Sequence, residues 1–160
     1  MTRDAAWAAL AAVPDPEIPA ISIVDLGIVR EVECKGSHVA VTVTPTYAGC
    51  PATEVIREDI TRALTGAGAT EVTVRTVLSP PWTTDWLSEE TKARLAAYGI
   101  APPQGRADDG RRPLVFRPRI RCPRCGSAHT EQLSAFGATA CKALYRCGDC
   151  REPFEYFKPI

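Results

Sequence analysis

The stretch HVAVTVTPTYAGCPATEVIREDITRALTG, residues 38–66, decides the fold around it. Its apolar residues first alternate as in a β-strand and then recur with the spacing of an α-helix. Residues 38–44 alternate apolar and polar side chains, which predicts a β-strand. Pro51 suits the first turn of a helix over residues 51–66, and Gly66 suits its end. The expected apolar stripe of this helix consists of Val55, Ile56, Ile60, Ala63 and Leu64.

The flanking segments complete a small two-layer domain. Residues 28–34 alternate imperfectly and, with the turn at Lys35-Gly36-Ser37, predict a hairpin with the strand at 38–44. Further expected elements are a third strand at 70–78 and helices at 3–13 and 88–99. We therefore expect an α+β chain: an αββαβα domain over residues 1–100, a Pro- and Gly-rich linker at 101–113, and a small cysteine-rich β domain at 114–160.

Composition excludes several classes of partner. Lys plus Arg and Asp plus Glu number 19 each in 160 residues, and this balance argues against a polyanionic partner. The arginines of residues 105–121 read as a solvated linker, with a modest nucleic-acid or acidic-partner patch as the alternative: Arg106, Arg111, Arg112, Arg117, Arg119 and Arg121.

No apolar run approaches the ~20 residues of a membrane span, and the start of the chain lacks a signal-peptide pattern. We expect a cytoplasmic protein, in which seven cysteines indicate metal or thiol chemistry and not disulfides.

Two Cys-x-x-Cys pairs in the tail predict a metal site. CPRCG at 122–126 and CGDCR at 147–151 match the spacing of a four-thiolate zinc ribbon. The expected ligands are Cys122, Cys125, Cys147 and Cys150. A redox dithiol would account for either pair alone but not for both, whereas a rubredoxin-like iron site uses the same ligands. Four protein ligands leave no open position for a substrate, so the zinc site should be structural.

Other tail residues have milder interpretations. His129 is expected at the surface or beside the ligands, and Cys141 as a buried small residue, with a free thiol or a further ligand as its alternatives. Phe154, Tyr156 and Phe157 are expected to pack the ribbon, and in part they could dock a partner.

Cys50 raises a different question because it stands directly before the helix. Unpaired amides and the helix dipole at such a position favour a thiolate, which is a better nucleophile or metal ligand than a thiol. The alternative is a cysteine that only fills space. No histidine lies in a recognisable base position, which argues against a cysteine protease. Asp15 and Glu17 in DPEIP could brace their loop or act as polar neighbours of Cys50 or as metal ligands.

Several of these stretches resemble known families. VPDPEIPAISIVDLGIV (13–29) with TPTYAGCPATEVI (44–56) resembles the small domain shared by SufT-like proteins and the cytosolic iron–sulfur targeting factors. PPWTTDWLSEETKARLAAYGIAPP (80–103) and FGATACKALYRCGDCREPFEYFKPI (136–160) look more narrowly like the PaaD family, also called PaaJ. The resemblance covers essentially the whole chain.

The resemblance implies an accessory role in aerobic phenylacetate degradation, beside a di-iron phenylacetyl-CoA epoxidase and its iron–sulfur reductase. It implies help in maturing metal centres, with no catalytic activity expected of the chain alone. The functional cysteine of the wider family falls on Cys50, and the associated acid on Asp15. A lone Cys50 cannot hold an iron–sulfur cluster, so a transfer role needs a second subunit, a substrate protein, or thiols such as Cys34 or Cys141.

Three hypotheses follow. In the leading one, Cys50 transiently ligates iron or a cluster, for example across a symmetric dimer, and passes it to the oxygenase or reductase. Trp82 and Trp86 would then anchor the partner, or they would pack over the domain's own core. The second is a structural or regulatory epoxidase subunit without metal transfer, and the third is a thiol enzyme acting on a small acyl substrate. Exposed edge strands in a three-stranded sheet also suggest a homodimer.

Overall fold

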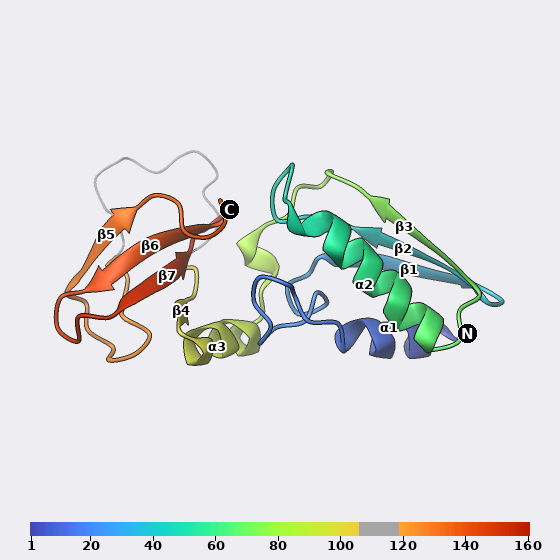
Figure 1. Ribbon diagram of the computed structural model, residues 1–160, viewed down its shortest axis with the longest axis horizontal. Helices are drawn as coiled ribbons and strands as arrows, with labels where there is room; N and C mark the ends of the chain where they lie inside the picture. The colour runs from blue at the N-terminus through green and yellow to red at the C-terminus, as the bar shows by residue number, and fades with distance from the viewer. Residues whose placement is uncertain (106–118) are drawn as a thin grey trace. The chain divides into compact units, whose positions relative to one another are not determined.

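The computed structural model describes residues 1–105 and 119–160, which form two compact units, Met1–Trp82 and Thr83–Ile160 (Figure 1). Each unit has its own β-sheet. Most of the arginine run and the latter part of the predicted linker lie outside the described residues. No helix of the described part has the length and apolar character needed to cross a membrane.

The sheet of the first unit has the order β1-β2-β3, formed by Val29–Lys35, His38–Val43 and Glu71–Thr76. β1 and β2 form the predicted antiparallel hairpin, whose turn places Gly36 at a φ of 63°. β3 pairs parallel with β2. Parallel neighbours require a crossover connection, and helix α2, Ala52–Gly66, supplies it.

Two helices cover one face of this sheet, α2 and the N-terminal helix α1, Arg3–Ala11 (Figure 1). Ile56, Ile60 and Leu64 recur every fourth residue on α2 and are all buried. The predicted stripe was too wide at one position, since Val55 is 45% exposed. Adjacent helical residues do not share a face, so burying Ile56 turns Val55 outward.

The two faces of the sheet differ in polarity, because side chains alternate along each strand. On β2 every second residue, beginning with Val39, is buried under the helices. The opposite face carries His38, Thr73 and other polar side chains. His38 Nε2 lies 3.2 Å from Thr73 Oγ1, so this histidine has a cross-strand partner that its sequence position did not reveal.

The second unit contains a short 3₁₀ helix η1, helix α3 and a four-stranded sheet in the order β4-β7-β6-β5. Their bounds are Thr84–Trp86 for η1, Glu89–Tyr98 for α3, Ile100–Ala101 for β4, Thr130–Ser134 for β5, Lys142–Cys147 for β6 and Pro153–Phe157 for β7. Ser88 caps α3 and Gly99, at a φ of 97°, ends it. Because β4 pairs with β7, α3 and β4 belong to the second unit, whereas the expected division lay after residue 100.

The second core is built around aromatic residues of β6 and β7. Phe154, Tyr156 and Phe157 are buried, which confirms their predicted packing role. The Tyr145 ring stacks on Phe154 at 5.9 Å and meets the edge of Tyr156 at 5.7 Å. Two cysteines, Cys122 and Cys147, are members of the same buried cluster, which ties this core to the predicted metal site.

Candidate metal centre and the Cys50 thiol

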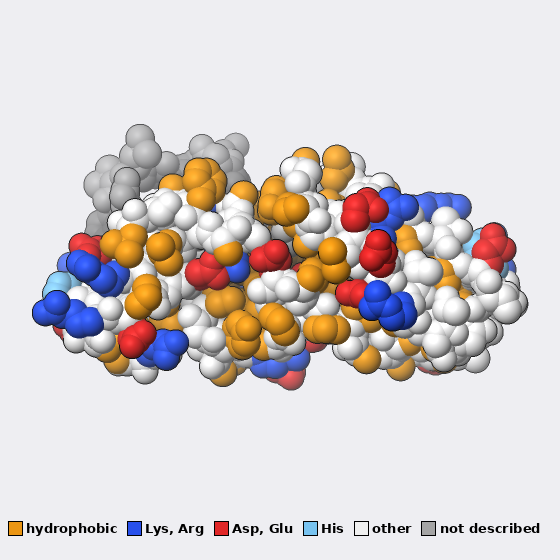
Figure 2. All heavy atoms as spheres, viewed as in Figure 1, with side chains coloured by type: hydrophobic (Ala, Val, Ile, Leu, Met, Phe, Trp, Pro, Cys, Tyr) orange, Lys and Arg blue, Asp and Glu red, His pale blue; other side chains and the backbone are white. Residues whose placement is uncertain are grey.

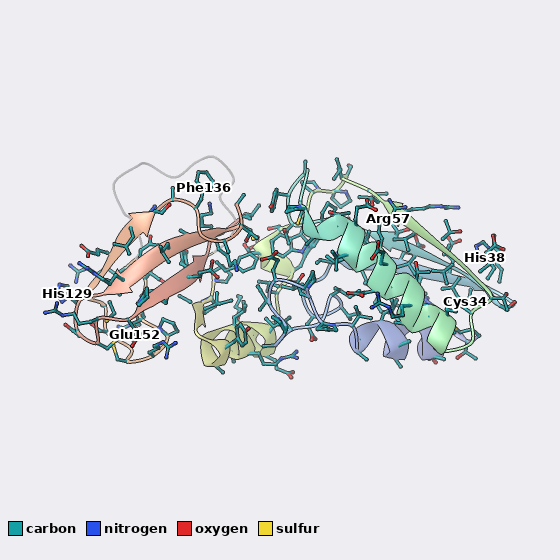
Figure 3. The ribbon with its side chains drawn as sticks, in the orientation of Figure 1. Cys34, His38, Arg57, His129, Phe136 and Glu152 are labelled. Atoms are coloured by element: carbon teal, nitrogen blue, oxygen red, sulfur yellow. The ribbon has the colours of Figure 1, made fainter. Side chains whose placement is uncertain are left out.

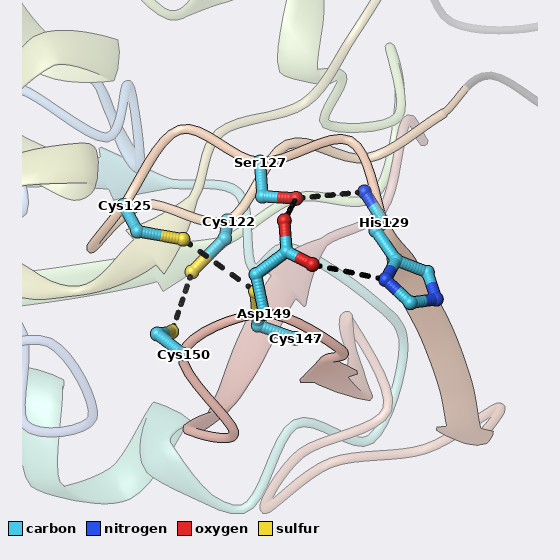
Figure 4. Close-up of polar contacts among 7 residues, drawn as sticks. All are labelled: Cys122, Cys125, Ser127, His129, Cys147, Asp149 and Cys150. Carbon is cyan, nitrogen blue, oxygen red and sulfur yellow. Dashed lines mark hydrogen bonds and ion pairs between the residues drawn. The ribbon is translucent and has the colours of Figure 1, made fainter.

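The four cysteines of the two Cys-x-x-Cys pairs lie together, with all four sulfurs within 4.8 Å of one another (Figure 4). Cys122 Sγ lies 3.7 Å from Cys150 Sγ, and Cys125 Sγ lies 3.5 Å from Cys147 Sγ. A tetrahedral ion with metal–sulfur bonds of about 2.3 Å needs sulfurs about 3.8 Å apart. The sulfurs therefore fit a tetrahedral metal ion with no other ligand.

Two matched turns hold these sulfurs in place. In the first, the Cys122 amide donates to the Ser127 carbonyl at 2.9 Å, and Gly126 has a φ of 75°. In the second, the Cys147 amide donates to the Glu152 carbonyl at 3.0 Å, and Arg151 has a φ of 66°. The left-handed position is natural for glycine, whereas at Arg151 the surrounding turn imposes it.

The thiols of the cluster cannot all ionise without a cation. The backbone amides of Cys150 and Asp149 lower the pKa of Cys147 to about 6. The Glu152 amide also favours the Cys150 thiolate, but burial and the sulfurs of Cys147, Cys125 and Cys122 outweigh it and raise the pKa of Cys150 to about 12. Neighbouring like charges explain this divergence. A divalent cation would offset them, as metal sites with thiolate ligands require.

A polar network outside the sulfurs joins the two turns. Asp149 accepts a hydrogen bond from Ser127 Oγ, and its Oδ1 lies 3.0 Å from His129 Nδ1. The hydrogen bond with Ser127 makes the largest contribution to lowering the pKa of Asp149, and the hydrogen bond with His129 makes the next largest. Because Ser127 bonds the carboxylate and not the imidazole, the trio does not have the arrangement of a hydrolase triad. In the sequence, the only indication of this polar network is that two of its residues lie close to the metal ligands. Asp149 stands within the second Cys-x-x-Cys pair, and Ser127 follows Gly126.

Cys50 is half-buried in the loop that leads from β2 into α2. Pro51 is the N-cap of α2 and supplies no side-chain cap. Thr53 instead closes the turn, donating to the Cys50 carbonyl from its amide at 3.2 Å and from its hydroxyl at 2.8 Å. The carbonyl of Cys50 is thus committed to the helix start, while its sulfur makes no hydrogen bond with the described residues.

Asp15 is buried and braces its own loop. Its Oδ1 accepts hydrogen bonds from the amides of Glu17 and Ile18, both at 2.9 Å. This favours the bracing interpretation, and a role of Asp15 beside Cys50 stays a prediction. The TPTYAGC stretch also contains Thr44, whose buried Oγ1 has no hydrogen-bond partner among the described residues.

The two other thiols differ in their ability to assist Cys50. Cys34 pairs with Val39 near the start of β2, whereas the Cys50 loop leaves β2 after Val43 (Figure 3). Four residues of strand separate these ends by about 13 Å, so Cys34 and Cys50 of one chain cannot bind the same ion. Cys141 is buried, with its sulfur 3.0 Å from Thr139 Oγ1, as expected of a packing residue.

The two tryptophans do not form a joint docking surface. Trp82 is 3% exposed, and its indole Nε1 donates to the Leu26 carbonyl at 2.8 Å. The docking prediction is therefore wrong for Trp82, since its ring closes the core of the first unit. Trp86 is half-buried in η1, and its docking role stays a prediction.

Two family models match the chain, one on each unit. Residues 3–75 match a model described as an iron–sulfur cluster assembly protein, and residues 107–158 match the PaaD zinc beta ribbon domain. A protein of Escherichia coli (strain K12), provisionally named as one of the subunits of 1,2-phenylacetyl-CoA epoxidase, is 52% identical over 154 residues. That similarity covers 96% of this chain and 91% of the relative. The chain belongs to the PaaD family.

Further relatives match only part of this PaaD-family protein. A protein of Porphyromonas gingivalis (strain ATCC BAA-308 / W83), named an Fe-S protein maturation auxiliary factor, is 35% identical over 88 residues, covering 54% of this chain and 83% of that protein. A crystal structure of a domain of unknown function, DUF59, from Bacillus anthracis matches with a TM-score of 0.54 and 33% identity. It covers 57% of this chain and 89% of that one.

Proposed function

We propose that this protein is an accessory factor of a phenylacetyl-CoA 1,2-epoxidase system and assists assembly of an iron–sulfur or di-iron centre through Cys50. The name of its Escherichia coli relative supports the link with the epoxidase. The family model over residues 3–75 supports the link with iron–sulfur assembly. The observation that carries the proposal is the half-buried Cys50 thiol, placed directly before α2 within that matched region.

The chemistry assigned to Cys50 is reversible ligation. Its thiol loses a proton when the sulfur binds iron and regains one when the iron leaves. One thiolate cannot complete the coordination of iron or a cluster, and Cys34 is too far away to help. The remaining ligands must therefore come from the donor, the recipient or small molecules. Asp15 contributes by holding the DPEIP loop in shape.

We infer that the four tail cysteines bind one structural zinc ion. The sulfur tetrahedron and the zinc ribbon model over residues 107–158 support this assignment. A zinc ion with four thiolate ligands has no open coordination position, so it would stabilise the ribbon without taking part in iron or cluster transfer. Elemental analysis and the visible spectrum distinguish it from iron, because ferric tetrathiolate sites absorb strongly and zinc sites are colourless.

The partners under this proposal are the oxygenase and reductase subunits of the epoxidase, in the cytoplasm. A test co-expresses them with the wild-type chain, with Cys50→Ser, or with Cys34→Ser as the matched control. We expect Cys50→Ser to lower both epoxidation of phenylacetyl-CoA and the iron content of the purified recipient, and Cys34→Ser to change neither. Full activity and iron content with Cys50→Ser would refute the transfer role.

The description of the relative as a subunit favours a second candidate, a structural or regulatory component of the epoxidase without metal transfer. The two candidates differ when the other subunits already contain their metals. A maturation factor is then dispensable, whereas a structural subunit is still required for epoxidation. Assaying metal-loaded oxygenase and reductase with and without this protein decides between them.

A further inference from the structure

The two edges of the first sheet are not equally protected. The register of β1 with β2 is irregular between Val29 and Glu31, and the charged side chains of β1 are exposed. Both features discourage pairing of β1 with another strand. β3 keeps an unbroken register with β2 from Glu71 to Thr76. Within the described residues no strand pairs with its other side. β3 therefore presents a regular, unpaired edge.

The sequence of β3 is complementary to itself in antiparallel register. Pairing two copies about Thr73 places Val72 opposite Val74 and Glu71 opposite Arg75, each twice by symmetry. Glu71 and Arg75 are both exposed, and neither forms an ion pair with the residues that the structure describes. We infer that the protein forms a two-fold dimer in which β3 pairs with β3 of a second copy, centred on Thr73.

The apolar face of β3 also favours such a partner. Val72 and Val74 are half-buried and line a groove together with residues of α2. A second β3 would cover these valines with its own. Acidic and basic side chains alternate along the α2 wall, as in the Glu54–Arg57 pair at 3.6 Å (Figure 2). A wall of mixed sign can face its own copy without net repulsion.

This dimer constrains how Cys50 works. Because β3 runs parallel to β2, its Thr76 end lies beside Val43, from which the Cys50 loop departs. Antiparallel pairing of the two β3 strands sends these ends in opposite directions along a ribbon about 20 Å long. The two Cys50 thiols of the dimer then lie at opposite ends and do not share a cluster. Each would act separately, in contrast to the expected bridging across a symmetric dimer.

Charge reversal on the full-length, metal-bound protein tests the dimer. Sedimentation should show a dimer for the wild type, and Glu71→Arg or Arg75→Glu should each raise its Kd by about tenfold or more, because two cross-strand pairs become repulsive. The combined variant restores opposite charges and should recover most of the affinity. Glu33→Arg and Lys35→Glu on β1 are the matched controls and should leave the Kd unchanged. The proposal would be overturned if the wild type were monomeric at 100 µM, roughly the concentration at which weak dimers become visible. It would also be overturned if the combined variant dimerised as weakly as the single variants.

Disulfide trapping gives a second test that does not depend on those charges. Thr73→Cys places two thiols on the two-fold axis, where directly opposed residues have Cα atoms about 4.5–5.5 Å apart, within disulfide range. Mild oxidation of Thr73→Cys should give a covalent dimer, and Thr42→Cys on the central strand β2 should not. Equal cross-linking of both variants, or none of Thr73→Cys, would contradict the register.

Discussion

At the scale of single residues, the two half-buried thiols of the first unit stand in different surroundings. Cys34 lies on strand β1, whereas Cys50 directly precedes the first turn of α2, at the positive end of the helix dipole. We predict that, with the tail metal in place, iodoacetamide at neutral pH labels Cys50 faster than Cys34. Peptide mass mapping over time measures both rates in one sample. Faster labelling of Cys34, or an inert Cys50, would contradict the placement of a reactive thiol at the helix start.

Cys147 is a cluster thiol whose pKa the fold lowers, whereas the pKa of Cys150 is raised. Its pKa falls from 9.0 to about 6, so the ionised form stabilises the folded cluster fully above pH 9 and this contribution is lost as the pH falls through about 6. We predict that zinc is retained at pH 7 and released only below about pH 6, because the bound cation also holds Cys125 and Cys150 ionised, whose pKa values are raised without it. A chromogenic zinc indicator follows the release. Half-release above pH 7 would show that the cation and the Cys150 and Asp149 amides together do not keep the thiolates ionised.

At the scale of elements, an ion pair joins β6 to β7. The Lys142 side chain is 3% exposed, and its Nζ lies 2.7 Å from Glu155 Oε2. We predict that Glu155→Ala lowers the free energy of unfolding of the zinc-bound protein by about 3 kcal/mol, since it leaves a buried ammonium unpaired. Glu131→Ala breaks the exposed Arg146–Glu131 pair between β5 and β6 and should cost less than about 1 kcal/mol. Urea unfolding measures both, and equal costs would contradict the burial argument.

The elements that the sequence predicted well are those with a local signal. The hairpin at Gly36 and helix α2 follow from period and turn chemistry within a few residues. β4 has only two residues and exists because β7, more than fifty positions later, pairs with it. The burial of Trp82 depends in the same way on a distant carbonyl, that of Leu26. Such contacts leave no periodic trace in the sequence.

The site shows the same division between local and distant information. The Cys-x-x-Cys spacing was sufficient to predict that four sulfurs would meet. The contacts of Asp149 with Ser127 and His129 join loops twenty or more positions apart, and only the folded chain reveals them. Likewise, the separation of Cys34 from Cys50 depends on strand register, which no single segment specifies.

At the scale of the whole molecule, the two units should respond differently to loss of metal. The first has a core of its own, whereas the core of the second includes the metal-site residues Cys122 and Cys147. We predict that a strong chelator unfolds the second unit and leaves the first folded, because small metal domains depend on their ion. Amide NMR spectra should lose dispersion only for residues after Trp82. Simultaneous collapse of both units, or no change, would contradict this independence.

The most direct test of the central claim is anaerobic metal analysis of the wild type and Cys50→Ser after loading with ferrous iron and sulfide, in the presence of a small-molecule thiol that supplies the remaining ligands. The account predicts one zinc ion per chain in both proteins, held by the tail cysteines, and iron bound by the wild type alone. Equal iron in the two proteins would show that Cys50 is not the iron ligand and would contradict the proposed function.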